Sequence, residues 1–116
     1  MPLHLSHTTV DARDPQRLAR FCSDLTGWMH QIGDDGPDEV DLIDDNGFTT
    51  LFFLVPEPKT VKNRFHFDLR PVDSTRDLEV ERAVELVARV IDDRRAREGW
   101  VVLAEPEGNE FCILNK

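Results

Sequence analysis

The chain has 116 residues, of which 40% are hydrophobic and 32% are charged, and these proportions are those of an ordinary folded domain. Its 23 acidic residues outnumber the 14 basic ones and give a formal net charge of −9, which disfavours nucleic acid as a partner because phosphates would be repelled. No apolar run approaches the roughly 20 residues of a membrane-spanning helix, and the two cysteines make no disulfide framework. We therefore expect one cytoplasmic domain that contacts neither nucleic acid nor a membrane.

The chain is predicted to begin with a strand and a helix. Residues 3–10 alternate between the two faces of a strand, and His7 lies within them. Asp14 and Pro15 then predict the start of a helix, because aspartate caps free backbone N–H groups and proline suits the first helical position. An apolar stripe at helical spacing follows, and Gly27 stands where a helix C-cap belongs.

Three more strands complete the first half of the chain. They are predicted at residues 28–32, 40–43 and 48–55. Asn46-Gly47 precedes the last of them and is typical of a tight hairpin, because both residues tolerate positive φ. Segment 56–59 contains two prolines, which cannot donate a ladder hydrogen bond, so we expect a linker there. The first half therefore has the order β-α-β-β-β.

A strictly alternating segment at residues 64–69 opens the second half. Its apolar residues are Phe65, Phe67 and Leu69. They share one face of a strand, which we expect to be buried. His66 and Asp68 share the opposite face, so two groups capable of proton transfer or metal binding lie side by side.

The remainder of the second half repeats the order of the first. A second helical stripe consists of Val80, Ala83, Val84 and Val87. Strands are predicted at residues 90–91, 100–104 and 110–114, with a turn at 105–108 before the last. We therefore expect a single domain of residues 1–116, built from module 1 (1–56) and module 2 (62–116) and joined by a proline-containing linker.

The duplicated β-α-β-β-β order resembles the vicinal oxygen chelate superfamily, which includes glyoxalase I, fosfomycin- and bleomycin-resistance proteins and extradiol dioxygenases. The most specific segments are His7-Thr8-Thr9-Val10, residues 62–69 and residues 100–112, and they look most like small bacterial glyoxalase-like domains. The resemblance implies an α+β fold in which two βαβββ modules form a cupped, incompletely closed mixed β-barrel, with helices outside and a ligand site in the cup. It also implies a homodimer.

The resemblance further implies where a metal ion would bind. His7 and His66 match the histidine positions of metal-dependent members. Phe53 falls near the ligand position of the fourth strand and cannot coordinate a metal. The position of the final glutamate ligand is occupied by Cys112, and Glu110 lies two residues earlier on the same strand face.

Three interpretations of these positions stay open. A set of His7, His66 and Glu110 would be a two-histidine-one-carboxylate site for Fe(II), Mn(II), Ni(II) or Zn(II). A set of His7, His66 and Cys112 would favour Zn(II), because thiolate is a soft ligand. In the third interpretation the pocket has lost its metal and holds an organic ligand by shape and hydrogen bonds.

These interpretations lead to two main functional hypotheses. The first is a divalent-metal-dependent lyase, isomerase or dioxygenase of the glyoxalase type, with Glu110 or Asp68 as the catalytic base. The second is a metal-free drug- or antibiotic-binding protein of the bleomycin-resistance type, with Phe53 and Trp100 as aromatic pocket walls. A structural dimerisation module is a third possibility, which leaves the histidine of each module unexplained.

Overall fold

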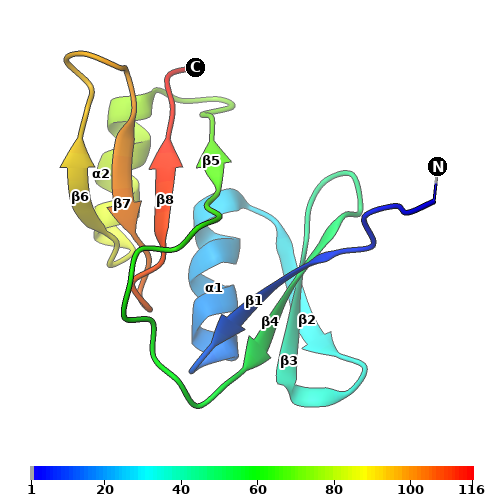
Figure 1. Cartoon of the computed structure of the whole chain (residues 1–116). Helices are drawn as coiled ribbons and strands as arrows, with labels where there is room; N and C mark the ends of the chain where they lie inside the picture. The colour runs from blue at the N-terminus through cyan, green and yellow to red at the C-terminus, as the bar shows by residue number, and fades with distance from the viewer. Residues whose placement is uncertain (1) are drawn as a thin grey trace. The chain divides into compact units, whose positions relative to one another are not determined.

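The computed structural model describes residues 2–116 and divides into two compact units, Met1–Pro58 and Lys59–Lys116. Each unit has the predicted order β-α-β-β-β and forms one four-stranded mixed sheet (Figure 1). The fold is therefore α+β, as predicted, and the strands of each unit form a separate four-stranded sheet. Neither helix in residues 2–116 combines the length and the apolar character needed to cross a membrane.

The first unit consists of β1 (Thr8–Ala12), α1 (Pro15–Thr26), β2 (Met29–Gly33), β3 (Gly36–Ile43) and β4 (Thr49–Leu54). Its strand order is β1-β4-β3-β2, with β1 parallel to β4 and the other neighbours antiparallel. The predicted caps of α1 are confirmed, because Asp14 accepts a hydrogen bond of 3.1 Å from the backbone N–H of Arg17 and Gly27 ends the helix at φ 79°.

The predicted first strand, residues 3–10, is wrong at its start. Strand β1 begins only at Thr8, where it pairs with Thr50 of β4. Residues 3–7 precede this ladder, and their side chains, including those of Leu3 and Leu5, are exposed. His7 is therefore an exposed residue just before β1, and its Nδ1 lies 3.0 Å from Oγ of Ser6.

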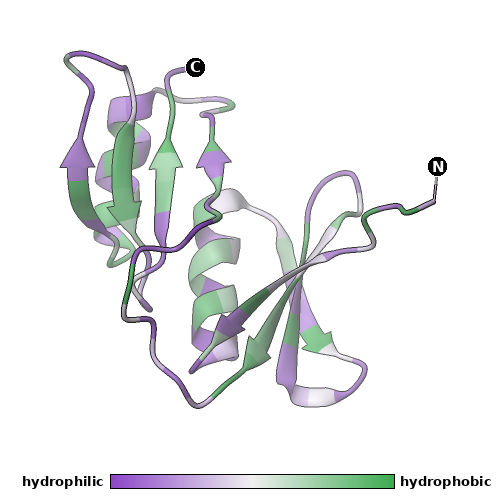
Figure 2. Ribbon diagram, viewed as in Figure 1, coloured by the Kyte–Doolittle hydropathy of each residue, from purple (hydrophilic) through white to green (hydrophobic). Residues whose placement is uncertain are grey.

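The second unit consists of β5 (Asp68–Leu69), α2 (Arg76–Glu85), β6 (Arg89–Asp93), β7 (Val101–Ala104) and β8 (Glu110–Ile113). Its strand order, β5-β8-β7-β6, repeats that of the first unit, and β5 is parallel to β8. Its core comes from α2 and one face of the sheet, chiefly Val80, Ala83, Val101, Leu103 and Phe111. Figure 2 shows the hydrophobic character of β7 beside the hydrophilic start of β8.

The predicted strand 64–69 shrinks to the two residues of β5. Phe65 is 93% exposed, so its expected place on a buried face is wrong. The reason lies in Asn63, whose side-chain amide donates to the carbonyl of Phe65 and whose Oδ1 accepts from the N–H of Glu110 at 2.8 Å. These bonds hold the segment as a loop, and ladder bonding starts where the carbonyl of Phe67 accepts from Cys112.

The predicted stripe of the second helix is confirmed only in part. Val80 and Ala83 are buried, whereas Val84 and Val87 are 47% and 61% exposed. Helix α2 ends at Glu85, and Val87 has a left-handed backbone with φ 78°, which turns the chain away from the helical path. A β-branched residue disfavours this conformation, so the helix end carries backbone strain that α1 avoids with Gly27.

Candidate functional site

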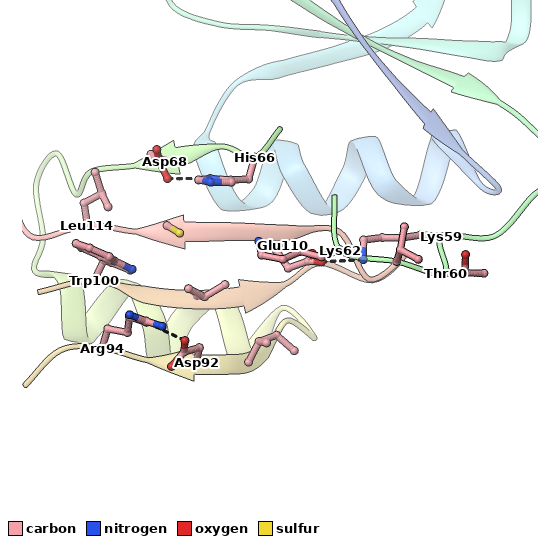
Figure 3. Close-up of a pocket in the computed structure, with 14 residues that line it drawn as sticks. Lys59, Thr60, Lys62, His66, Asp68, Asp92, Arg94, Trp100, Glu110 and Leu114 are labelled. Carbon is pink, nitrogen blue, oxygen red and sulfur yellow. Dashed lines mark hydrogen bonds and ion pairs between the residues drawn. The ribbon is translucent and has the colours of Figure 1, made fainter. Parts of the chain in front are cut away.

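A cavity of about 640 Å³ lies within the second unit (Figure 3). Its walls come from the sheet and from the segment of residues 59–67 that precedes β5, which we call the strap. Five residues predicted to have a role at the site line this cavity, namely His66, Asp68, Trp100, Glu110 and Cys112. The other two predicted residues, His7 and Phe53, belong to the first unit, where Phe53 is a partly exposed residue of β4.

Three potential metal ligands converge on one wall of the cavity. The ligand atoms of His66, Asp68 and Cys112 all lie within 4.8 Å of one another, and no other such group of three occurs in the described part of the chain. The parallel pairing of β5 with β8 places Asp68 opposite Cys112. His66 lies two residues before Asp68, and its Nδ1 is 3.1 Å from the Asp68 carboxylate. The fold thus brings together nitrogen, oxygen and sulfur donors.

The thiol of Cys112 is protonated at neutral pH. Burial raises its pKa to about 11, and the nearby carboxylate of Asp68 adds to this rise. A thiol with this pKa is a weak nucleophile, because only the thiolate reacts. The site therefore favours Cys112 as a hydrogen-bond donor or as a metal ligand over Cys112 as a nucleophile.

Glu110 is engaged in an ion pair on the same wall. Its Oε1 lies 2.7 Å from Nζ of Lys59, and the two side chains are only 10% and 20% exposed. Burial acts to raise the pKa of Glu110, but the ammonium of Lys59 and the N–H of Asn63 outweigh it and hold the pKa below its usual range. Glu110 is thus ionised at neutral pH and binds the strap to the first residue of β8.

The far end of the cavity is built by β6 and β7. Strand β6 contains a bulge between Val90 and Asp92, and the extra residue, Ile91, lines the cavity together with Asp92. Arg94 bonds to Asp92 at 2.8 Å, and its backbone N–H donates to the carbonyl of Trp100 at 2.9 Å. The apolar side chains of Ile91 and Trp100 thus line the cavity beside Arg94 and Asp92, whose charges neutralise one another.

The strap and the bulge are the parts of the site that sequence reasoning missed. Lys62 and Asn63 belong to segment 62–69, which was singled out for its resemblance to known proteins, but their roles depend on contacts with Glu110 and with the cavity. The proline-containing linker signalled a break in the sheet, and this break is where the strap begins. Nothing local in the sequence of β6 marks its bulge.

The donor cluster is not repeated in the first unit. In the first unit β1 pairs with β4 in the way that β5 pairs with β8 in the second. Thr9 then corresponds to Asp68, and its partner Leu51 corresponds to Cys112. His7 is the equivalent of His66, but it lacks a carboxylate and a thiol at the corresponding positions. The two units therefore share a topology while only the second carries a complete set of three donors.

Comparisons with known proteins identify relatives of the whole chain. Residues 7–114 match a family model described as a glyoxalase-like domain, and no curated protein matches the chain. The fosfomycin resistance protein FosX from Mesorhizobium loti has a similar structure, with a TM-score of 0.76 and 17% identity over 100% of this chain and 94% of that chain. A glyoxalase/bleomycin resistance/dioxygenase family enzyme from Burkholderia phytofirmans has a TM-score of 0.75 and 22% identity over 96% and 97%.

A third structure includes a metal ion. It is a variant of FosX from Listeria monocytogenes complexed with Mn(II) and 1S,2S-dihydroxypropylphosphonic acid, and it has a TM-score of 0.72 and 15% identity over 98% of this chain and 90% of that chain. At these identities the solved structures show a shared fold, and the resemblance inferred from the sequence motifs is confirmed.

Proposed function

Since this chain belongs to the glyoxalase-like domain family of the vicinal oxygen chelate superfamily, we propose that its second-unit cavity binds a small organic molecule beside a divalent metal ion. His66, Asp68 and Cys112 are the proposed ligands of that ion. The convergence of their donor atoms within 4.8 Å on the cavity wall carries the proposal. The family match spans both units, which supports a single domain made of two modules.

The chemistry of the donors fits a transition metal. Imidazole nitrogen, carboxylate oxygen and a cysteine sulfur together suit Zn(II) best, because thiolate prefers softer cations, and they also suit Fe(II) or Ni(II). The thiol of Cys112 must lose its proton on binding, so metal uptake releases a proton and strengthens as the pH rises. This donor set differs from both sets that the resemblance suggested. Asp68 takes the place of His7, and the last ligand is Cys112, one of the two alternatives considered for that position, and not Glu110.

The proposed reaction is a proton transfer of the lyase or isomerase type. When bound, the metal supplies Lewis-acid stabilisation of negative charge on a substrate oxygen. Glu110 is the proposed proton acceptor, because its carboxylate is ionised at neutral pH and lines the same cavity. Lys59 holds that carboxylate in place, and Trp100 gives the cavity an apolar wall.

A second candidate function is metal-free binding of a small molecule. It is favoured by the bonding within the cluster, because Asp68 already bonds to the imidazole of His66 and to the thiol of Cys112. With these groups satisfied by one another, the cavity would hold a ligand by shape and hydrogen bonds alone.

Metal content separates the two candidates. We would incubate untagged protein with Mn(II), Fe(II), Ni(II) or Zn(II), remove free metal, and count bound ions by mass spectrometry. The first candidate requires about one ion per chain in the wild type, lost in His66→Ala and sharply reduced in Cys112→Ser. His30→Ala is the matched control, because His30 is exposed on β2 in the first unit.

His7→Ala discriminates between the two ligand sets. If the ion is held within the second unit, this variant retains it, whereas loss of the ion would support the set that includes His7. Absence of retained metal in the wild type with every ion would refute the metal-dependent candidate and leave the binding candidate.

A further inference from the structure

The cations of the cavity wall differ in whether they form an ion pair within residues 2–116. Lys59 pairs with Glu110, His66 with Asp68, and Arg94 with Asp92. Lys62 also lines the cavity, and within residues 2–116 it makes no ion pair. An unpaired ammonium stands out in a chain whose formal net charge is −9, because acidic side chains are abundant.

The strap fixes the region in which this ammonium lies. Lys59 and Asn63, on either side of Lys62, both bond to Glu110 at the start of β8. The charge of Lys62 acts on both Glu110 and Cys112, and in each case it favours the ionised form. The pinned strap therefore presents a positive charge to the donor-bearing wall of the cavity.

The opposite end of the cavity combines apolar side chains with the ion pair of Arg94 and Asp92. The apolar lining residues include Trp100, Val102, Leu114 and the bulge residue Ile91. In Figure 3, Trp100 and Leu114 lie toward one end of the sheet, while Lys59, Lys62 and Glu110 lie toward the other. The indole of Trp100 offers a large flat surface for a planar or apolar group.

We infer that the ligand of this cavity is a small organic anion, whose carboxylate, phosphate or phosphonate group pairs with Lys62 while its apolar body packs against Trp100. The inference rests on the proposed ligand site in this cavity and does not depend on the metal ion. Lys62 is a specificity-determining residue in this assignment, because it selects anions over neutral molecules of the same shape.

Isothermal titration calorimetry with matched probes tests the inference on the full chain, with and without added zinc. 3-Phenylpropionate and 3-phenylpropanol share a body and differ in charge, propionate lacks the aromatic body, and phenylphosphonate distinguishes a phosphonate from a carboxylate. We expect 3-phenylpropionate to bind about fivefold more tightly than the alcohol, as a partly exposed ion pair allows. Propionate should bind far more weakly, and added NaCl should weaken only the anions.

The matched variants are Lys62→Met and Lys116→Met, which remove the same charge inside and outside the cavity. Both lysines are exposed, so neither change disturbs the core. Lys62→Met should remove the preference for the anion and leave the Kd of the alcohol within twofold, while Lys116→Met should change neither.

The outcomes separate this inference from the function on which it rests. Equal binding of alcohol and anion by the wild type, or an unchanged preference in Lys62→Met, would overturn the anion assignment and keep the ligand site. Failure of every probe to bind would overturn the ligand site and the assignment together. A preference for phenylphosphonate over 3-phenylpropionate that also requires Lys62 would support the assignment and identify the phosphonate class.

Discussion

The ion pair between Lys59 and Glu110 should couple the strap to the sheet strongly enough to measure. The two charges are 2.7 Å apart and their side chains are largely buried. Coulomb's law with an effective dielectric constant of about 20 gives a gross attraction of roughly 6 kcal/mol, and lost hydration offsets most of it. We expect a net coupling free energy of about 1–2 kcal/mol between these residues.

A double-mutant cycle measures this coupling. Glu110→Gln should lower the free energy of unfolding by about 2 kcal/mol, because it leaves the ammonium of Lys59 partly buried without a counterion. Lys59→Met should cost about 1–2 kcal/mol, since the Glu110 carboxylate keeps its bond from Asn63. In the double variant, the free energy of unfolding should fall by about 1–2 kcal/mol less than the sum of the decreases in the two single variants.

Urea unfolding followed by tryptophan fluorescence is the assay, with Glu57→Gln as an exposed control that should change stability by less than about 0.5 kcal/mol. Acid provides a second test. Because the pKa of Glu110 is lowered in the folded state, its contribution is present above the ordinary glutamate pKa of 4.5 and is lost as the pH falls through the lowered value. Additive single effects at neutral pH would refute the coupling and with it the role of Lys59 in fixing the strap.

Four further predictions concern the strap, the turn, the thiol and the helix caps. Asn63→Ala removes the bond to the N–H of Glu110, so trypsin should cleave the strap after Lys62 faster than in the wild type. An unchanged cleavage rate would show that Asn63 does not restrain the strap. Burial raises the pKa of Glu105, so the charged form of this residue lowers the stability of the fold above pH 4.5. In urea unfolding at pH 7, Glu105→Gln should therefore leave the free energy of unfolding nearly unchanged. Glu105→Ala should lower it by about 2 kcal/mol, because two backbone N–H groups lose their acceptor. Iodoacetamide labelling of Cys112, quantified by peptide mass spectrometry, should accelerate about tenfold per pH unit between about pH 8 and pH 10, and Asp68→Asn should speed it at every pH because the carboxylate raises the pKa of the thiol. Gly27→Ala should lower the free energy of unfolding by about 1 kcal/mol through backbone strain alone, because a Cβ there meets no atom within 4 Å, and a loss above about 3 kcal/mol would contradict that cause.

The features that the sequence predicted well are those with local causes. Helix α1 could be placed from Asp14, Pro15 and Gly27, because capping acts between residues a few positions apart. The repeated element order followed from hydrophobic periodicity in the same way. By contrast, the start of β5 depends on bonds between Asn63 and Glu110, which are 47 residues apart in the chain. No periodicity within residues 64–69 reveals them.

The candidate site shows the same division. His66 and Asp68 were recognisable as a pair, because they share a strand face at a spacing of two residues. The resemblance also offered His66 and Cys112 as members of one site. The place of Asp68 opposite Cys112 depends on the parallel pairing of β5 with β8, which no short motif in the sequence encodes. Glu110 was expected to point toward a metal or a substrate. Its ion pair with Lys59 joins residues far apart in the sequence, so no local pattern predicts it.

The strap has a further consequence for how the chain can vary in length. A connector between two repeats is ordinarily the place where insertions and deletions are tolerated. Here residues 59–62 also line the cavity, and Lys59 and Asn63 bond to the same glutamate from either side of Lys62. One added residue within that interval would change the spacing between Lys62 and one of these two anchors. Natural or engineered insertions should therefore be tolerated around Glu57 but should disrupt the cavity wall a few positions later, because the two anchors fix the length of the connector there.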